Sequence, residues 1–453
     1  MIWKNPLASA PLLRIDSWHS THLKTMSSLR FAALVHTLAA MSLLSGTLRA
    51  AAPTEVRSWK SVTGSTIEAR ATSFQDGVAT LETPSGRVLQ VPSAKLAPEE
   101  RSFLDEHFGR TGVGETKDEG GPAALAHPLG KVAGPIAAGG SHYFLYLPKS
   151  LKTGRTAPLL FFTNSGGGNP GRLSAMLEGS EICGWILAIS VESKNGMDVP
   201  ESVAHCSNCV SHIKETLPVD PKRVYFSGTS GGSREAFENS VAMDSAGVLA
   251  IIAGAQPGQV NRRKHYFFIS GATDYNRYGT AKSFSEAKSS AAFRFHPKGH
   301  TFGPEWLVTE GMVWLESKWH QKTNTRDAAR ADFETAALDW VETMKDVEPW
   351  RAAWWARQLT DDGLMLPASL ARAAALTKEL GTQADAVGYA KAIKELEDFA
   401  VKELSEGPNY SPGCFNHTTP GIRKEAEKLL LRHGGVPWVK DICAALGNPT
   451  DKP

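Results

Sequence analysis

The stretch that most constrains the fold of this chain is residues 222–234, Lys-Arg-Val-Tyr-Phe-Ser-Gly-Thr-Ser-Gly-Gly-Ser-Arg. Its apolar run Val224–Phe226 predicts a buried strand, and a helical pattern begins at about Glu235. Between the two lies Gly228-Thr-Ser-Gly-Gly232, a Gly-x-Ser-x-Gly sequence. A strand, this pentapeptide and a helix together hold a serine at the tip of a tight turn, where it can act as a nucleophile. The outer glycines fit such a turn, because a Cβ there would clash with the adjoining strand or helix.

Strand patterns and helical patterns alternate around this turn, from residue 129 to 322. The predicted strands are near-continuous apolar runs: Tyr143–Leu147, Leu159–Thr163, Trp185–Val191, Val224–Ser227, Leu249–Ala253, Tyr266–Ser270 and Phe293–His296. This alternation predicts an α/β fold with a mostly parallel sheet covered on both faces. In such sheets the chemistry lies at the carboxyl ends of the strands. After Phe302 the pattern becomes helical, so residues 323–453 are predicted to form an all-α C-terminal region.

A nucleophilic serine needs a base, and the base needs an acid that orients it. Hydrolases built on a strand–turn–helix supply these groups in the order Ser, acid, His. Here Ser230 is followed by Asp274, just after one predicted strand, and by His300, just after the next. His296 is the weaker candidate for the base because it lies within a strand. The sequence therefore predicts Ser230, Asp274 and His300 as a catalytic triad.

Glycines next to two of the predicted strands are candidates for an oxyanion hole. The run Asn164-Ser-Gly-Gly-Gly168 directly follows a buried strand, so Gly166 and Gly167 can turn their N–H groups toward a substrate. The other predicted donor is the N–H of Gly231, the residue after the nucleophile. No Gly-Lys-Ser/Thr follows the glycine run, so the sequence does not indicate a phosphate-binding loop.

Residues 129–322 resemble the α/β-hydrolase superfamily, and more closely its secreted esterases of the polyhydroxybutyrate-depolymerase and feruloyl-esterase type. The similar segments are Val219-Asp-Pro-Lys-Arg-Val224, Gly228-x-Ser-x-Gly232, Gly271-x-x-Asp274 and Gly299-His-Thr-Phe302. The resemblance implies Ser230 as nucleophile, His300 as base and Asp274 as acid, with acyl transfer through an acyl-enzyme and neither a metal nor another cofactor. Two features depart from the family: Asn164-Ser165 stands where a histidine usually leads the oxyanion loop, and the helix after the turn is more polar.

The N-terminal residues 1–52 have the pattern of a signal peptide. Arg30 precedes an apolar run that continues to Leu44, and small residues follow at Ala50–Ala52. A start at Met26 would give this signal a normal length. The apolar core is too short and too interrupted for a stable membrane span. We expect a secreted or periplasmic protein that begins near Ala51; the alternative is an amphipathic helix or an uncleaved anchor.

Residues 55–108 form a first small unit with strand-like alternation. Turn sequences lie at Asp76-Gly77 and Ser85-Gly86, and Ala97-Pro-Glu-Glu100 predicts the start of a helix. The pattern resembles the SLA-homology module, a small β-barrel of exported bacterial proteins. The resemblance implies binding or attachment rather than catalysis, but it does not identify the ligand, for which a cell-wall component or a polysaccharide is a candidate. The alternative is that this unit serves only as a spacer or packs against the next domain. Residues 109–128 have the composition of a linker.

The composition excludes some functions and leaves others open. A net charge of +2 and the lack of a basic stripe argue against a nucleic-acid partner. Cys206 and Cys209 have helical spacing and no second Cys/His pair, so we interpret them as small core residues rather than a metal or redox site, with a structural disulfide as a further alternative. Cys414 and Cys443 could form a bridge. The C-terminal tryptophans have helical spacing and are expected to pack in a core, with a carbohydrate-stacking surface as the alternative. Trp354-Trp355 is the pair that tests this expectation, because adjacent residues cannot both face one core.

The sequence thus favours an exported serine hydrolase whose substrate is a small-molecule or polymer ester. Two alternatives stay open. One is a peptidase of the same fold, and the other is a non-catalytic exported binding protein that uses the hydrolase fold as a scaffold.

Overall fold

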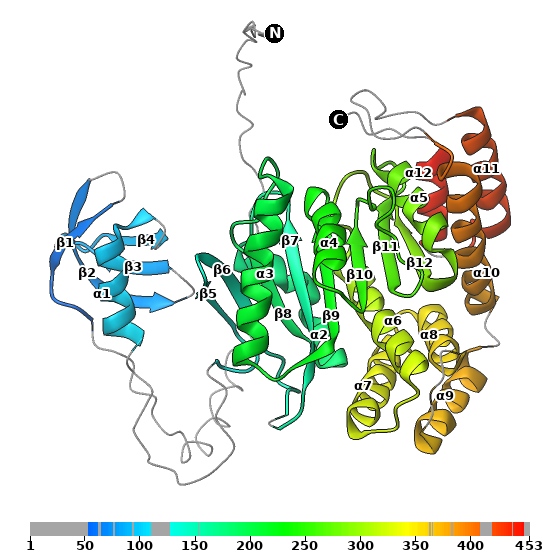
Figure 1. The fold of residues 1–453 in the computed structure, drawn as a ribbon, viewed down its shortest axis with the longest axis horizontal. Coiled ribbons are helices and arrows are strands. Elements are labelled where there is room, and N and C mark those ends of the chain that lie inside the picture. The colour runs from blue at the N-terminus through cyan, green and yellow to red at the C-terminus, as the bar shows by residue number, and fades with distance from the viewer. Residues whose placement is uncertain are drawn as a thin grey trace, which may run out of the picture. The chain divides into compact units, whose positions relative to one another are not determined.

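The computed structural model describes residues 53–109, apart from 62–64, 76–77 and 93–94, and residues 127–447, apart from 153, 362–363, 365, 382–383, 408–418 and 437. The predicted signal at 1–52 therefore lies outside the described residues, as does nearly all of the predicted linker. The chain divides into two compact units, Met1–Glu119 and Gly120–Pro453 (Figure 1).

The first unit is an antiparallel sheet with one helix. Its strands pair in chain order: β1 (Arg57–Lys60), β2 (Thr66–Gln75), β3 (Val78–Glu82) and β4 (Val88–Pro92), followed by α1 (Pro98–Gly109). A small core forms around the buried Trp59, whose indole Nε1 donates to the carbonyl oxygen of Ala69 at 2.8 Å. The turn at Ser85-Gly86 and the helix start after Ala97 are confirmed. Among the described strands β1 and β4 each pair with one neighbour, so the closed barrel stays a prediction.

The second unit is built on one sheet of eight strands in the order β12-β11-β10-β9-β7-β8-β6-β5. The strands from β12 to β8 are parallel, and β6 and β5 are antiparallel to their neighbours. The bounds are β5 (Val132–Ala138), β6 (Ser141–Tyr146), β7 (Ala157–Asn164), β8 (Ile186–Ser190), β9 (Val219–Thr229), β10 (Gly247–Ile251), β11 (His265–Gly271) and β12 (Ala291–His296). The mostly parallel sheet is consistent with the predicted α/β-hydrolase fold. Only β5 was not predicted, because this edge strand contains Pro135 and is largely exposed.

Helices cover both faces of this sheet. They include α2 (Leu177–Cys183), α3 (Val199–Thr216), α4 (Gly231–Ala242), α5 (Arg277–Ala287) and α6 (Glu305–Thr323), with short 3-10 helices at Pro170–Met176 and Lys288–Ser290. On α4, Phe237 stacks on Phe268 of β11. On α6, a Cβ at Gly311 would lie 2.8 Å from the ring of Phe267, the preceding residue of the same strand. Because neighbouring side chains of a strand point to opposite faces, α4 and α6 lie on opposite sides of the sheet.

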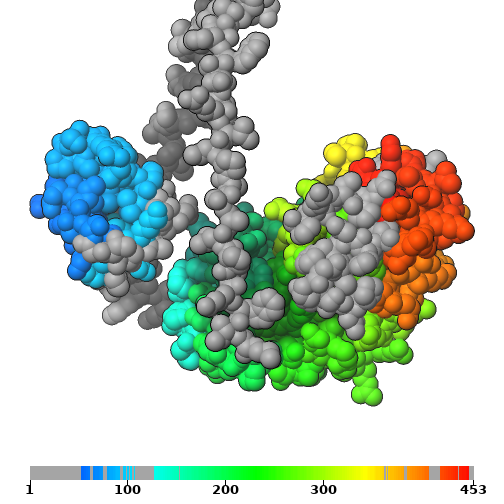
Figure 2. All heavy atoms as spheres, turned by 90° about the horizontal axis from the view of Figure 1, so that it is seen from above, coloured from blue at the N-terminus to red at the C-terminus, as the bar shows by residue number. Residues whose placement is uncertain are grey.

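The predicted all-α C-terminal region is confirmed. It contains α7 (Ala328–Met344), α8 (Pro349–Asp361), α9 (Pro367–Leu380), α10 (Ala384–Phe399), a π-helical turn at Ala400–Leu404, α11 (Pro420–His433) and α12 (Val439–Gly447). These helices belong to the same compact unit as the sheet. Within that unit the orange and red C-terminal helices lie at the end opposite the cyan β5 (Figures 1 and 2).

The tryptophans of α8 pack in the core, as expected, and both rings of the adjacent pair Trp354-Trp355 are buried. Trp355 is fully buried, lies edge-on to Trp340 of α7 and donates its indole N–H to Glu310 of α6 at 2.9 Å. Trp354 is 9% exposed and packs against Tyr389 of α10. The reason is that α8 is covered on two sides, so adjacent residues find different partners.

The cysteines of α3 are core residues, as predicted. Cys206 and Cys209 are fully buried and free, and Cys206 Sγ lies 3.5 Å from a carboxylate oxygen of Glu235 on α4. Cys443 is also free, whereas Cys414 lies outside the described residues. Within the described ranges, no group of three or more His, Cys, Asp or Glu side chains could hold a metal ion.

Candidate active site

Ser230 lies at the sharp turn between β9 and α4. Its backbone angles are φ 56° and ψ −120°, a region that residues with a side chain rarely adopt. A hydrogen bond to the neighbouring strand β10 stabilises this turn: the Ser230 N–H donates to the Ile251 carbonyl oxygen at 3.0 Å. The predicted strand–turn–helix is therefore present, with the serine side chain at its tip.

The two outer glycines of the turn allow three backbone segments to meet. A Cβ at Gly228 would lie 2.3 Å from the carbonyl oxygen of Gly232, and a Cβ at Gly232 would lie 2.3 Å from that of Thr163 in β7. Both distances are far below contact distance, and the obstructing atoms are backbone that cannot move aside. The sequence-based reason for these glycines is confirmed.

The structure brings Ser230, His300 and Asp274 together at the carboxyl ends of β9, β12 and β11. The imidazole of His300 connects the other two: its Nε2 lies 2.8 Å from Ser230 Oγ, and its Nδ1 lies 2.9 Å from Asp274 Oδ1. An ionised carboxylate can only accept hydrogen bonds, so Nδ1 carries the proton and Nε2 can accept the one from Ser230. Asp274 is fully buried, and its Oδ1 also accepts the Asn276 N–H at 2.8 Å.

The surroundings of His300 fix its ring and set it apart from His296. The ring of Tyr275 stacks on that of His300 with centroids 4.1 Å apart, and the His300 side chain keeps 24% of its surface exposed. His296 is fully buried at the end of β12, and its Nδ1 accepts the Lys298 N–H at 3.3 Å. Burial lowers the pKa of His296 to about 4, although nearby Asp274 opposes this shift. The structure thus places His300, and not His296, against the serine.

The loop after β7 contains the predicted oxyanion glycines, and Asn164 organises it. The Asn164 side chain accepts from the Thr229 hydroxyl at 2.8 Å and donates to the Gly167 carbonyl oxygen at 3.0 Å. The Gly167 N–H donates to the Asn164 carbonyl oxygen at 3.0 Å, so this N–H closes a turn instead of pointing at a substrate. Of the three predicted donors, Gly167 is therefore not suited to the role, which leaves Gly166 and Gly231.

Sequence analysis missed Asn195, which lies over the nucleophile turn. Gly231 is the first residue of α4, so its N–H is not needed by the hydrogen bonds of the helix itself. A Cβ at Gly231 would lie 1.8 Å from Asn195 Oδ1, so the amide of Asn195 is in direct contact with this backbone. No motif marks Asn195 in the sequence, because it comes from a loop between β8 and α3.

A half-buried carboxylate attaches that loop to the nucleophile helix. Glu235 of α4 accepts hydrogen bonds from the hydroxyls of Ser193, in the loop, and Ser202, on α3. On the same helix, Arg234 Nη2 donates to the Asn276 side chain at 3.0 Å. These bonds explain why the helix after Ser230 is more polar than expected: its polar residues position the loops around the site.

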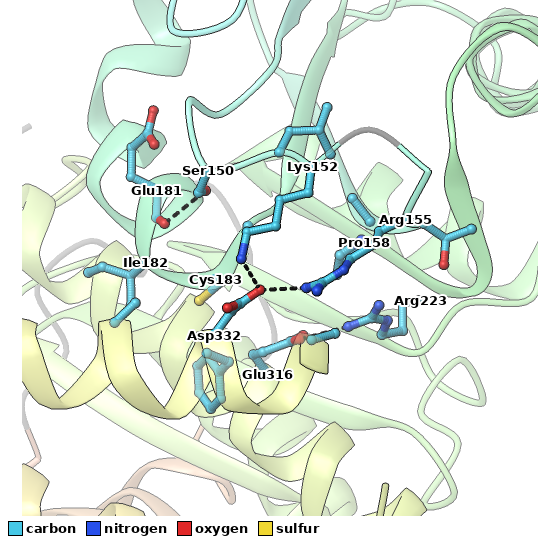
Figure 3. Close-up of a pocket in the computed structure, with 17 residues that line it drawn as sticks. Ser150, Lys152, Arg155, Pro158, Glu181, Ile182, Cys183, Arg223, Glu316 and Asp332 are labelled. Carbon is cyan, nitrogen blue, oxygen red and sulfur yellow. Dashed lines mark hydrogen bonds and ion pairs between the residues drawn. The ribbon is translucent and has the colours of Figure 1, made fainter. Parts of the chain in front are cut away.

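Two cavities in the second unit differ in their relation to Ser230. One, of about 300 Å³, lies beside the triad, since Tyr275 and Arg234 form part of its wall. The other, of about 100 Å³, lies at the amino end of β7 around Ala157, roughly 20 Å along the sheet from the serine. There Lys152 and Arg155 both pair with Asp332 of α7 (Figure 3). Its charged groups are paired and far from the triad, so it is not a candidate active site.

Comparisons with known proteins give only distant similarity. No family model and no curated protein sequence matches the chain. Among solved structures, an arylesterase has 11% identity and a TM-score of 0.35 over 42% of this chain and 86% of its own. Est1E from Butyrivibrio proteoclasticus has 13% identity and a TM-score of 0.34 over 43% of this chain and 100% of its own. A prolyl endopeptidase has 14% identity and a TM-score of 0.29 over 39% and 35%. We rest no conclusion on similarities at this level.

Proposed function

We propose that this chain is a serine hydrolase that cleaves carboxylic esters through an acyl-enzyme. The observation that supports it most directly is the position of His300, whose two ring nitrogens lie 2.8 Å from Ser230 Oγ and 2.9 Å from Asp274 Oδ1. A serine, a histidine and a carboxylate at these distances can transfer the serine proton and stabilise the imidazolium that results. In this proposal Ser230 is the nucleophile, His300 the base and Asp274 the acid.

In the first half of the reaction, Ser230 Oγ attacks the acyl carbonyl while His300 Nε2 takes its proton. The negative charge that forms on the carbonyl oxygen is stabilised by N–H groups aimed at that position. We assign this role to Gly231, at the start of α4, and to Gly166. Collapse of the tetrahedral intermediate breaks the ester bond, and His300 returns the proton to the leaving alcohol.

In the second half, water attacks the acyl-enzyme with His300 again as base. The new tetrahedral intermediate collapses, releases the carboxylic acid and restores the Ser230 hydroxyl. Asp274 stays ionised throughout: it holds the Nδ1–H tautomer and stabilises the imidazolium. Because Asp274 is fully buried and also fixed by the Asn276 N–H, it holds the ring of His300 in one orientation.

Labelling with a fluorophosphonate probe tests the nucleophile directly. The wild-type chain should be labelled and should hydrolyse 4-nitrophenyl esters, while Ser230→Ala should lose both without losing its fold by circular dichroism. Ser211→Ala, on the exposed side of α3, is the matched control and should behave as wild type. Labelling of Ser230→Ala at the wild-type rate would refute the assignment.

A parallel panel of anilides separates an esterase from a peptidase of the same fold. We expect turnover of the esters and little of the matched anilides, whose amine is a much poorer leaving group. Faster turnover of peptide anilides than of esters would identify a peptidase instead.

We also propose that the protein is exported and that residues 55–108 bind a wall component or a polysaccharide. The support is the sequence pattern of residues 1–52 and the likeness of the first unit to the SLA-homology module. Among the helices that the structure describes, none has the length and apolarity needed to cross a bilayer. Fractionation of a producing cell tests export, and a pull-down of the isolated wall fraction by the full chain, with and without residues 55–108, tests binding.

A further inference from the structure

The side chain of Asn195 lies beside Gly231, one of the two residues assigned as oxyanion donors. Its Oδ1 lies 1.8 Å, and its Nδ2 3.1 Å, from the position that a Cβ at Gly231 would take. A methyl group at that position and the Asn195 amide could not coexist, so glycine at 231 leaves room for the amide to approach this backbone. Both ends of the amide are therefore close to an oxygen atom that binds the Gly231 N–H.

The backbone of Asn195 is fixed to the other side of the proposed oxyanion hole. The Asn195 N–H donates to the Ser165 carbonyl oxygen at 2.9 Å, and Ser165 directly precedes Gly166, the second assigned donor. Two residues before Asn195, the hydroxyl of Ser193 donates to Glu235 of α4. The loop that carries Asn195 is thus attached both to the glycine loop after β7 and to the nucleophile helix.

The Asn195 amide is available to a bound substrate. Asn195 is exposed, and none of the residues that the structure describes exchanges a hydrogen bond with its side chain. A side-chain amide carries two N–H donors at one end and an acceptor at the other. Rotation about the Cβ–Cγ bond has only broad preferences, so it can exchange the two ends. The Nδ2 end can therefore turn toward a carbonyl oxygen at Gly231 without movement of the loop.

We propose that Asn195 is a catalytic residue whose Nδ2 donates a hydrogen bond to the oxyanion, as a third donor beside Gly231 and Gly166. This inference rests on the proposed function and adds a residue to the same site. When Ser230 Oγ bonds to the acyl carbon, its proton goes to His300 and the electron pair of the C=O bond moves to the carbonyl oxygen. A hydrogen bond to this charged oxygen is stronger than one to the neutral carbonyl, so Asn195 stabilises the transition state more than the bound ester.

Asn195→Ala tests the proposal in the full-length chain with 4-nitrophenyl acetate as substrate. We expect kcat/KM to fall about 10²-fold, a typical effect of removing one donor from an oxyanion hole. Asn195→Asp keeps the size of the side chain but offers no N–H when ionised, so it should lose at least as much activity. Lys194→Ala, at the exposed neighbouring position in the same loop, is the matched control and should keep the wild-type rate.

A reactive inhibitor and its unreactive analogue distinguish a donor from a residue that only shapes the site. A phenethyl trifluoromethyl ketone forms a tetrahedral adduct with Ser230 whose oxyanion occupies the hole, whereas the corresponding secondary alcohol cannot. Asn195→Ala should raise the inhibition constant of the ketone about 10²-fold, in parallel with the loss in kcat/KM, and leave that of the alcohol within about twofold of wild type. An equal change for the two inhibitors would refute the proposal.

A double-mutant cycle with Gly231→Ala tests the contact itself. The added methyl group would displace the Asn195 amide, so Gly231→Ala should lower kcat/KM by about the same factor as Asn195→Ala. In the Asn195→Ala background the same substitution should have little further effect, because no amide remains to be displaced. If Gly231→Ala cost the same in both backgrounds, the amide beside Gly231 would play no part in the hole.

The outcomes separate this inference from the proposed function. If wild type hydrolyses the ester and is labelled by the fluorophosphonate, but Asn195→Ala keeps kcat/KM within about threefold of wild type, the third donor is refuted and the hydrolase stands. If wild type neither hydrolyses the ester nor is labelled, the proposed function fails, and this inference fails with it.

Discussion

Replacing His296 should change how the stability of the second unit depends on pH. His296 is fully buried at the end of β12, and a Cβ at Gly303 would lie 2.8 Å from its ring, so little room surrounds it. Burial lowers its pKa from 6.5 to about 4, with Asp274 opposing the shift and Lys298 adding to it. His296→Asn removes the titrating group and keeps an acceptor near the position of Nδ1, which receives the Lys298 N–H.

The size of the effect follows from the difference in pKa between the folded and unfolded states. Because the folded pKa is the lower one, the contribution to stability is complete above pH 6.5 and is lost as the pH falls toward 4. A shift from 6.5 to about 4 corresponds to about 3 kcal/mol in the free energy of unfolding when the loss is complete. At about pH 5, where the unfolded imidazole is already protonated, the loss is about 2 kcal/mol.

Urea unfolding followed by tryptophan fluorescence at several pH values between about 7.5 and 4.5 measures this difference. His296→Asn also changes packing, so its stability at about pH 7.5 need not equal that of wild type. The quantity compared is therefore the change with pH in the free energy of unfolding of wild type minus the same change for His296→Asn. His127→Asn, at a partly exposed position, is the control and should follow wild type. If the free energy of unfolding changed with pH by the same amount in wild type and His296→Asn, burial would not lower the pKa of His296 as predicted.

Three further substitutions have definite expected outcomes. Ser230→Gly should be about 1 kcal/mol more stable than Ser230→Ala in urea unfolding while both lack activity, because glycine relieves the positive φ; equal stabilities would argue against strain at the turn. Gly232→Ala should lower the free energy of unfolding by at least about 2 kcal/mol, since its Cβ would meet the Thr163 carbonyl oxygen; a wild-type melting curve would contradict the tight contact. Glu310→Gln should cost about 2 kcal/mol and leave the fluorophosphonate labelling rate unchanged, because it removes the carboxylate 3.0 Å from Nε of buried Arg351 and leaves that guanidinium paired with Glu348 alone. A loss below about 1 kcal/mol would show that the pair is replaceable.

Much of the α/β region could be predicted from sequence because its signals are local. Each interior strand is buried on both faces, so it appears as a continuous apolar run, and all seven predicted strands are present. The features that sequence analysis did not predict lack such a signal. The edge strand β5 is largely exposed and interrupted by proline. The burial of both Trp354 and Trp355 depends on α10 covering α8 from the second side, which is a long-range contact.

The sequence alone determined which residues can perform the proposed chemistry. The turn at Ser230, the acid Asp274 and the base His300 each follow a buried strand, and parallel strands end at the same edge of a sheet, so their order along the chain implies that they meet. Only the tertiary structure decided the distances between them and the contact of Asn195 with Gly231. It also showed that the Gly167 N–H closes its own turn and so is not a donor for the oxyanion hole. The cavity beside the triad was likewise decided by the tertiary structure. The physical reason is that a turn or a buried strand is encoded by neighbouring residues, whereas a cavity wall and a loop contact form only when distant segments pack together.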